Sequence, residues 1–124
     1  MPDADATVSE LKEQVREFCE ARDWDRYHNA KELAIGISTE AGELLEEFRF
    51  KSEDEVDAMF DDADRREALT DEVADVFYFV LRLAQRYDID LSEQLDRKMQ
   101  VNAEKYPVDD AKGSNEKYTE LDAE

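Results

Sequence analysis

Residues 33–48 read LAIGISTEAGELLEEF and carry two glutamates, Glu40 and Glu43, three positions apart. Residues 67–87 carry a similar pair, Glu72 and Asp75, within the run EVAD. In an α-helix, positions i and i+3 lie on the same face, so both carboxylates of each pair project in one direction. These two stretches are therefore the ones that decide the predicted fold.

Each acidic pair borders the apolar face of its helix at the same angle. With about 100° of rotation per residue, the apolar residues of the first stretch lie to one side of Glu40, and Glu43 lies about 60° away on the other side. The second stretch repeats this geometry around Glu72, with Asp75 in the place of Glu43. If the two apolar faces pack antiparallel, the four carboxylates converge at one edge of the contact.

Converging carboxylates repel one another, and proteins usually hold them with a shared proton or a divalent cation. Oxygen ligands suit Mg²⁺ or Mn²⁺, and these ions commonly bridge to substrate phosphates. We therefore expect a metal site made of the four acidic side chains Glu40, Glu43, Glu72 and Asp75. A di-iron centre is not expected, because it requires Glu-x-x-His pairs and the only histidine, His28, is not at that spacing.

The composition describes one small and very acidic domain. The 124 residues include 35 Asp and Glu against 16 Lys and Arg, for a net charge of −19. Since nucleic-acid backbones are bound through Lys and Arg, this charge argues against a nucleic-acid-binding protein. No signal peptide or membrane-spanning run is seen, so we expect a cytoplasmic protein. The single Cys19 is expected to be a small core residue.

Hydrophobic periodicity predicts four main helices, over residues 7–22, 29–50, 67–87 and 91–105, with a short helix between residues 52 and 62. Pro107 ends the last helix. We therefore expect a helical domain over residues 1–107 and an extended tail over 108–124 that can pack on a neighbouring subunit. Trp24, on the connection after the first helix, is either a core plug or a stacking surface for a ligand ring, with the plug favoured.

Further motifs occur in a fixed order around the two acidic pairs. They are RDWDRYH at 22–28, FRFK at 48–51, KMxxN at 98–102, KYP at 105–107 and KYTEL at 117–121. With these motifs, residues 8–121 resemble the MazG-like superfamily of all-α nucleoside triphosphate pyrophosphohydrolases, and most closely its dCTP pyrophosphatase branch. The resemblance implies a four-helix MazG-like bundle that assembles as a dimer or a dimer of dimers. It also implies Mg²⁺-dependent cleavage of a nucleotide to its monophosphate and pyrophosphate.

The resemblance also implies roles for individual residues. It implies that the two acidic pairs bind the metals. It also implies that Trp24 and Phe50 contact the base, with Phe79 as a neighbour. Phosphate and sugar contacts fall to Lys98, Asn102, Lys105, Tyr106, Lys117 and Tyr118. Our candidate for the general base is Glu43, with Glu46 and Glu47 as rivals. Phe50 stands where relatives often have Trp, and Val15 where they have His, so the preferred base stays open.

Three functions compete at this point. The leading one is a Mg²⁺-dependent pyrophosphohydrolase that removes dCTP-like or non-standard nucleotides from the pool. The second is an enzyme of the same fold acting on dUTP or phosphoribosyl-ATP. The third is an acidic helical interaction module without catalysis, for which Mg²⁺ should not shift the melting temperature.

The excess of acidic residues suggests adaptation to a salty (halophilic) cytoplasm, because salt screens the repulsion between them. We predict that the melting temperature rises as KCl increases from low to molar concentration, as followed by a series of thermal melts. Equal stability at the two extremes would rule out this adaptation.

Overall fold

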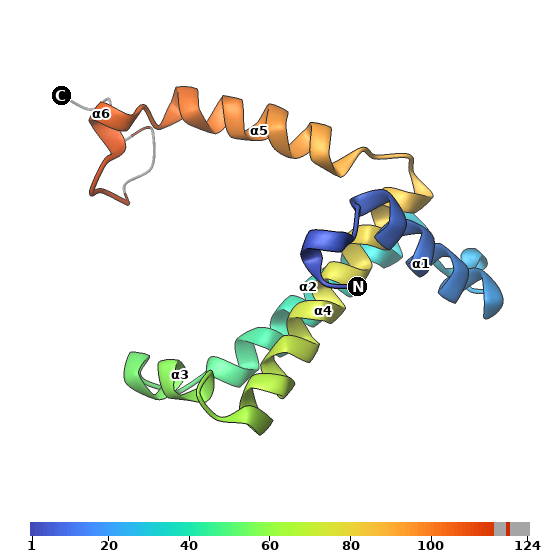
Figure 1. Cartoon of the computed structure of the whole chain (residues 1–124), viewed down its shortest axis with the longest axis horizontal. Coiled ribbons are helices and arrows are strands. Elements are labelled where there is room, and N and C mark those ends of the chain that lie inside the picture. Colours follow the sequence, from blue (N-terminus) through green and yellow to red (C-terminus); the bar gives the residue numbers. More distant parts are fainter. Residues whose placement is uncertain (116–118, 120–124) are drawn as a thin grey trace. The chain divides into compact units, whose positions relative to one another are not determined.

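Helices make up the regular structure of the protein, which a computed structural model describes for residues 1–115 and residue 119. The elements are η1 (Asp3–Asp5), α1 (Val8–Ala21), η2 (Asp25–Tyr27), α2 (Ala30–Phe48), α3 (Glu53–Met59), α4 (Ala63–Arg86), α5 (Leu91–Lys105) and α6 (Val108–Ala111) (Figure 1). No strand occurs among the described residues. The prediction of an all-α fold is confirmed.

Capping residues set the boundaries that periodicity predicts. Thr7 caps α1 in a capping box with Glu10, in which each side chain binds the backbone N–H of the other residue. The side chain of Asn29 caps α2 by accepting a hydrogen bond of 2.9 Å from the backbone N–H of Glu32. Both caps satisfy N–H groups that the first turn of a helix leaves without partners.

Two elements differ from the prediction. Helix α4 begins at Ala63 rather than at residue 67, because the carboxylate of Asp62 accepts hydrogen bonds from two backbone N–H groups of a polar first turn. Residues 108–124, predicted as extended, contain the single turn α6, in which the N–H of Ala111 donates to the carbonyl of Pro107 at 2.9 Å. Each segment is about one turn long and holds only one or two apolar residues, which is too few for periodicity to detect.

The chain divides into two compact units, Met1–Ile89 and Asp90–Glu124, and each is described by itself. The first unit contains α1 to α4, and the second contains α5 and α6. In the described part of the chain, no helix combines the length and the apolar character needed to cross a bilayer.

Helices α2 and α4 form the scaffold of the first unit and lie side by side, with α1 also packed on α4 (Figure 1). Gly36 of α2 faces Phe79 of α4, whereas Glu40, one turn later in α2, faces Glu72 and Asp75, which come earlier in α4. The two helices are therefore antiparallel. The buried apolar side chains of this unit are Cys19, Leu33, Met59, Leu69, Leu81 and Ala84. The prediction that Cys19 is a core residue is confirmed.

Gly36 allows α4 to approach α2 closely. A β-carbon at this position would lie 2.6 Å from the ring of Phe79, well inside van der Waals contact. At Gly42, a β-carbon would meet nothing within 4 Å among the described residues outside its own helix backbone. Of these two glycines inside α2, only Gly36 is required by packing.

We predict opposite effects of alanine at the two positions. Gly36→Ala should lower the free energy of unfolding by about 1–3 kcal/mol, since the added methyl group overpacks the contact with Phe79. Gly42→Ala should raise it by roughly 0.5–1 kcal/mol, since alanine is the better helix former. Urea unfolding followed by circular dichroism measures both values, and a stabilising Gly36→Ala would contradict the packing described here.

Candidate functional site

Three of the four carboxylates predicted to bind metal meet between α2 and α4. Glu40, Glu72 and Asp75 each place one carboxylate oxygen within 4.8 Å of the other two. The i, i+3 spacing puts Glu72 and Asp75 on one face of α4, and the antiparallel packing brings that face opposite Glu40. We call these three residues the carboxylate cluster.

Glu72 shows the electrostatic strain of this arrangement. Partial burial raises the pKa of its carboxyl group above the usual range, and the neighbouring charges of Glu40, Glu43, Asp75 and Glu47 raise the pKa further. Its Oε2 atom is buried and has no hydrogen-bond partner among the described residues. Buried polar atoms normally have such a partner, so this oxygen lacks a compensating ligand.

The carboxylate cluster fits a divalent metal ion. Three oxygen ligands converge, and one belongs to a side chain with an unpaired buried oxygen. Hard divalent cations prefer oxygen ligands, and their charge removes the repulsion that raises the pKa of Glu72. The donor set and the unpaired oxygen of Glu72 both suit such an ion.

Glu43 lies beside the carboxylate cluster and is exposed. It is not one of the three mutually close carboxylates, yet its charge raises the pKa of Glu72. Glu47 acts on Glu72 in the same way. Glu46 instead forms an ion pair of 3.2 Å with Arg49. Of the three candidates for a general base, Glu43 and Glu47 therefore act electrostatically on the cluster.

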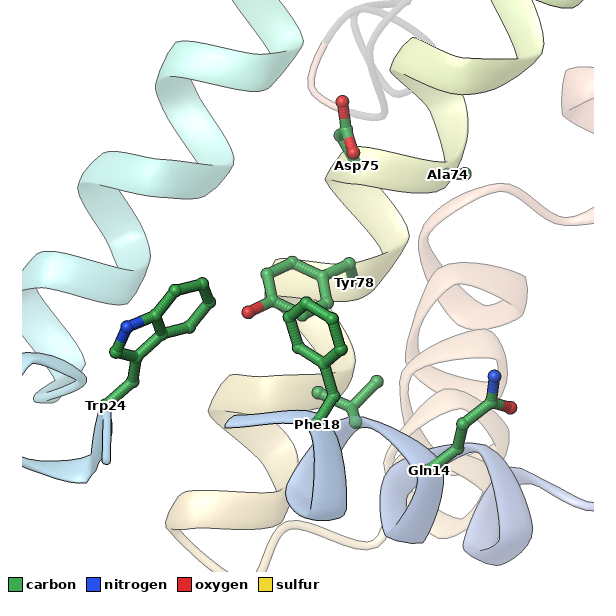
Figure 2. Close-up of a pocket in the computed structure, with 7 residues that line it drawn as sticks. Gln14, Phe18, Trp24, Ala74, Asp75 and Tyr78 are labelled. Atoms are coloured by element: carbon green, nitrogen blue, oxygen red, sulfur yellow. The ribbon is translucent and has the colours of Figure 1, made fainter. Parts of the chain in front are cut away.

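An aromatic cavity of about 430 Å³ adjoins the cluster (Figure 2). It is lined by Gln14, Val15 and Phe18 of α1, by Trp24, and by Ala74, Asp75 and Tyr78 of α4. The ring of Phe18 meets Trp24 edge to face at 5.7 Å and Tyr78 at 6.2 Å between centroids. Asp75 belongs both to the cavity wall and to the carboxylate cluster, so the two sites are continuous.

Trp24 combines the two roles that its sequence position left open. It is half-buried and packs edge to face on Phe18 and, at 6.0 Å, on His28. It also lines the cavity and leaves part of its indole accessible there (Figure 2). The indole is therefore packed against neighbouring rings as a core residue would be, and its accessible part can still stack on a ligand ring.

The sequence prediction did not single out Tyr78. Its hydroxyl lies 3.1 Å from the sulfur of Cys19, and burial raises the pKa of the phenol. Tyr78 follows Asp75 at the i+3 spacing, so both lie on the same helix face. That spacing was the available signal, because it places a ring next to a predicted metal ligand.

Phe79 is not among the residues that line the cavity. Its ring lies against Gly36, and its centroid is 5.0 Å from that of Tyr78. Phe79 therefore supports the cavity wall from behind through Tyr78.

Phe50 lies at the far end of α2 from Trp24. The 19 residues of α2 span about 28 Å, with Trp24 before its first turn and Phe50 after its last. Phe50 is 91% exposed and has a left-handed backbone, with φ of 63°, which is uncommon for a residue other than glycine. The guanidinium of Arg49 lies 4.6 Å from the centre of its ring. One chain thus does not bring Phe50 and Trp24 together.

The remaining predicted substrate-binding residues belong to the second unit. Lys98, Asn102 and Lys105 share one face of α5, because they are spaced at i, i+4 and i+7. Tyr106 caps the end of this helix, and its N–H donates to the carbonyl of Asn102 at 2.8 Å. Lys117 and Tyr118 lie outside the described residues.

Known proteins resemble this chain in sequence and in fold. Residues 35–121 match the MazG-like family. The chain is 35% identical to dCTP pyrophosphatase 1 of Mus musculus and 34% identical to that of Homo sapiens, over 115 residues that cover 93% of this chain and 68% of each relative. A pyrophosphatase of Archaeoglobus fulgidus DSM 4304 has a similar structure, with a TM-score of 0.75 and 39% identity over 81% of this chain and 92% of that one. The chain therefore belongs to the MazG-like family and is an enzyme of the nucleoside triphosphate pyrophosphohydrolase class.

Proposed function

We propose that the enzyme cleaves a dCTP-like or non-standard nucleoside triphosphate to the monophosphate and pyrophosphate, with Mg²⁺ as its metal. One observation carries this proposal: Asp75 belongs to both the carboxylate cluster and the aromatic cavity. A nucleotide needs this combination, because its base requires an aromatic pocket and its phosphates a cation nearby. Relatives named dCTP pyrophosphatase 1 support a substrate of this kind.

With a net charge of −19, an anionic substrate needs metal ions or a local basic cluster to bind, and the carboxylate cluster supports the metal. Glu40, Glu72 and Asp75 are the residues that would hold Mg²⁺, or Mn²⁺ in its place, with Glu43 beside them. When bound, such an ion neutralises phosphate charge and lowers the pKa of a coordinated water. Glu43 is our candidate to accept the proton of the attacking water, and Glu47 is its rival.

The cavity walls suit a nucleobase. Stacking on the exposed part of Trp24 is worth about 1–3 kcal/mol, by analogy with bases bound to aromatic side chains. The amide of Gln14 both donates and accepts hydrogen bonds, so it can pair with the polar edge of a base. The phosphate and sugar contacts that we propose are those that the family resemblance implies: Lys98, Asn102, Lys105, Tyr106, Lys117 and Tyr118.

We further propose that the enzyme works as a homodimer or a dimer of dimers. A base that contacts both Trp24 and Phe50 must receive Phe50 from a second copy, since Trp24 precedes α2, Phe50 follows it, and the helix between them is about 28 Å long. Exposed apolar side chains on α2 and α4 are consistent with such an interface. They are Ile35, Leu45, Val73 and Phe77.

The decisive experiment is a panel of canonical and modified nucleotides incubated with Mg²⁺ and scored for pyrophosphate against orthophosphate. We expect pyrophosphate from dCTP-like substrates, and no release from Glu40→Gln or Asp75→Asn. Both variants should stay folded, with equal or higher melting temperatures, because each removes like-charge repulsion.

Glu17→Gln, an equal change of charge on the exposed face of α1, is the control and should remain active. Orthophosphate as the product would refute this function, and dUTP or phosphoribosyl-ATP as the preferred substrate would redirect it.

Mixing two inactive variants tests the shared site. Trp24→Ala and Phe50→Ala should each lose most activity alone, because each removes one face of the base pocket. After subunit exchange, random pairing should restore roughly a quarter of wild-type activity, since half of the dimers carry one intact site. Activity that stays at the level of the separate variants would show that the base does not bridge two copies.

A further inference from the structure

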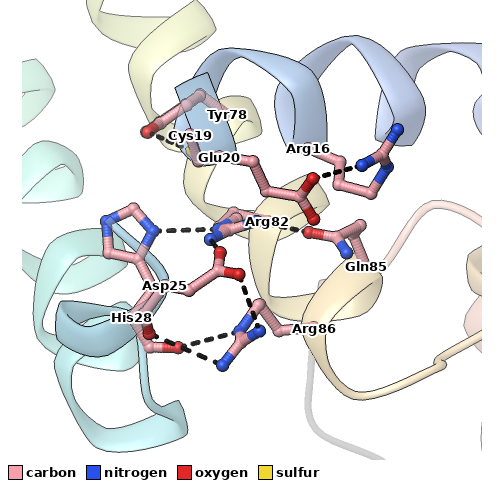
Figure 3. Close-up of polar contacts among 9 residues, drawn as sticks. All are labelled: Arg16, Cys19, Glu20, Asp25, His28, Tyr78, Arg82, Gln85 and Arg86. Carbon is pink, nitrogen blue, oxygen red and sulfur yellow. Dashed lines mark hydrogen bonds and ion pairs between the residues drawn. The ribbon is translucent and has the colours of Figure 1, made fainter. Parts of the chain in front are cut away.

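Arg82 is fully buried, with 0% of its surface exposed, and the proposed reaction does not use it. Its guanidinium donates to three side chains (Figure 3): from Nε to Nδ1 of His28 at 2.9 Å, from one terminal nitrogen to Gln85 at 2.6 Å, and from the other to the carboxylate of Asp25. A buried cation is costly unless it is paired in this way. Through His28 and Asp25, Arg82 links α4 to residues more than 50 positions earlier in the sequence.

Two of the three partners enclose the turn that follows Trp24. Asp25 is the first residue of η2, and His28 is its C-terminal cap. Arg86, one turn after Arg82 on α4, adds an ion pair of 3.6 Å with Asp25 and a hydrogen bond of 3.4 Å to the carbonyl of His28. Two arginines of α4 therefore attach both ends of η2 to the helix.

The charge states of the partners favour this attachment. The hydrogen bond from Arg82 holds the pKa of Asp25 below its usual value, so this carboxyl is ionised at neutral pH. Burial and the charge of Arg82 lower the pKa of His28, so its imidazole is neutral and Nδ1 accepts the bond from Arg82.

The position of Trp24 depends on this turn. Trp24 is the residue directly before η2, and its carbonyl accepts the hydrogen bond of 2.9 Å from the N–H of Tyr27 that closes the turn. Its indole lies edge to face with the ring of His28, which accepts a hydrogen bond from Arg82. A displacement of η2 or His28 therefore moves the ring that lines the cavity.

We propose that Arg82 is a positioning residue that sets the indole of Trp24 in the cavity wall by fixing Asp25 and His28. This inference rests on the proposed function, in which Trp24 stacks on the nucleobase. Arg82 lies seven residues, or about 10 Å along α4, from Asp75 of the carboxylate cluster. Its loss should therefore weaken binding of the base and leave the chemical step largely intact.

The test uses the intrinsic fluorescence of the full chain, because Trp24 is its only tryptophan. Without nucleotide, Arg82→Gln should shift the emission of Trp24 to longer wavelength and increase its quenching by acrylamide. With dCTP and Mg²⁺, KM should rise about tenfold while kcat changes by less than about threefold, the pattern of lost ground-state binding. Arg82→Lys should not restore either property, because one ammonium cannot replace a planar fork of donors.

Met59→Ala is the control, since it removes a buried side chain of α3 outside this network. It should lower the melting temperature without changing the emission of Trp24 or KM. If Arg82→Gln behaves like Met59→Ala, Arg82 is merely structural and the proposal is wrong.

Asp25→Asn keeps the test decisive if Arg82→Gln does not fold, because the side chain of Asp25 is 42% exposed. A red-shifted emission and a raised KM in this variant support the proposal, and wild-type values of both overturn it. The emission is measured without nucleotide, so it decides the positioning role even if no nucleotide is hydrolysed. Absence of nucleotide hydrolysis would contradict the proposed function, and the emission alone would then test the positioning role.

Discussion

The antiparallel contact between α2 and α4 is the constraint on which the site depends. Gly36 lets the ring of Phe79 lie against α2, and this register places Glu40 opposite Glu72 and Asp75. A shift of one helix by a single turn, about 5.4 Å, would separate the carboxylates. Repulsion opposes the contact at this edge, so the packing of the apolar core must offset it. Carboxylates held in mutual repulsion of this kind are often found at functional sites.

Helix α4 arranges the components of the site along one face. Asp75 lies at the carboxylate cluster, Tyr78 lines the cavity one turn later, and Arg82 anchors the η2 turn after another. The spacing of three to four residues keeps all of them on the same side of the helix. Along this face of α4, the acidic residue Asp75 therefore comes first, the aromatic ring of Tyr78 follows, and the buried guanidinium of Arg82 comes last. This order matches the separate needs of a metal, a ring and an anchored loop.

Much of the local structure was predictable because its causes are local. The caps at Thr7 and Asn29, the apolar faces and the two acidic pairs follow from residues a few positions apart. The start of α4 and the turn α6 were missed because each is about one turn long, with too few apolar residues to show a period. At the site, the cavity-lining position of Tyr78 was missed as well. Only its helical spacing from Asp75 pointed to it.

The sequence by itself determined which residues share a helix face, and its ordered motifs indicated the family that the comparisons confirm. Only the tertiary structure decided which faces meet. Nothing in the sequence distinguishes Arg82 from the other arginines of its helix. In the structure it is hydrogen-bonded to Asp25 and His28, which lie more than 50 positions earlier. Likewise, Trp24 and Phe50 look like partners in the sequence, yet the length of α2 separates them. The physical reason is that helical period acts over a few residues, whereas burial and contact depend on how distant elements pack.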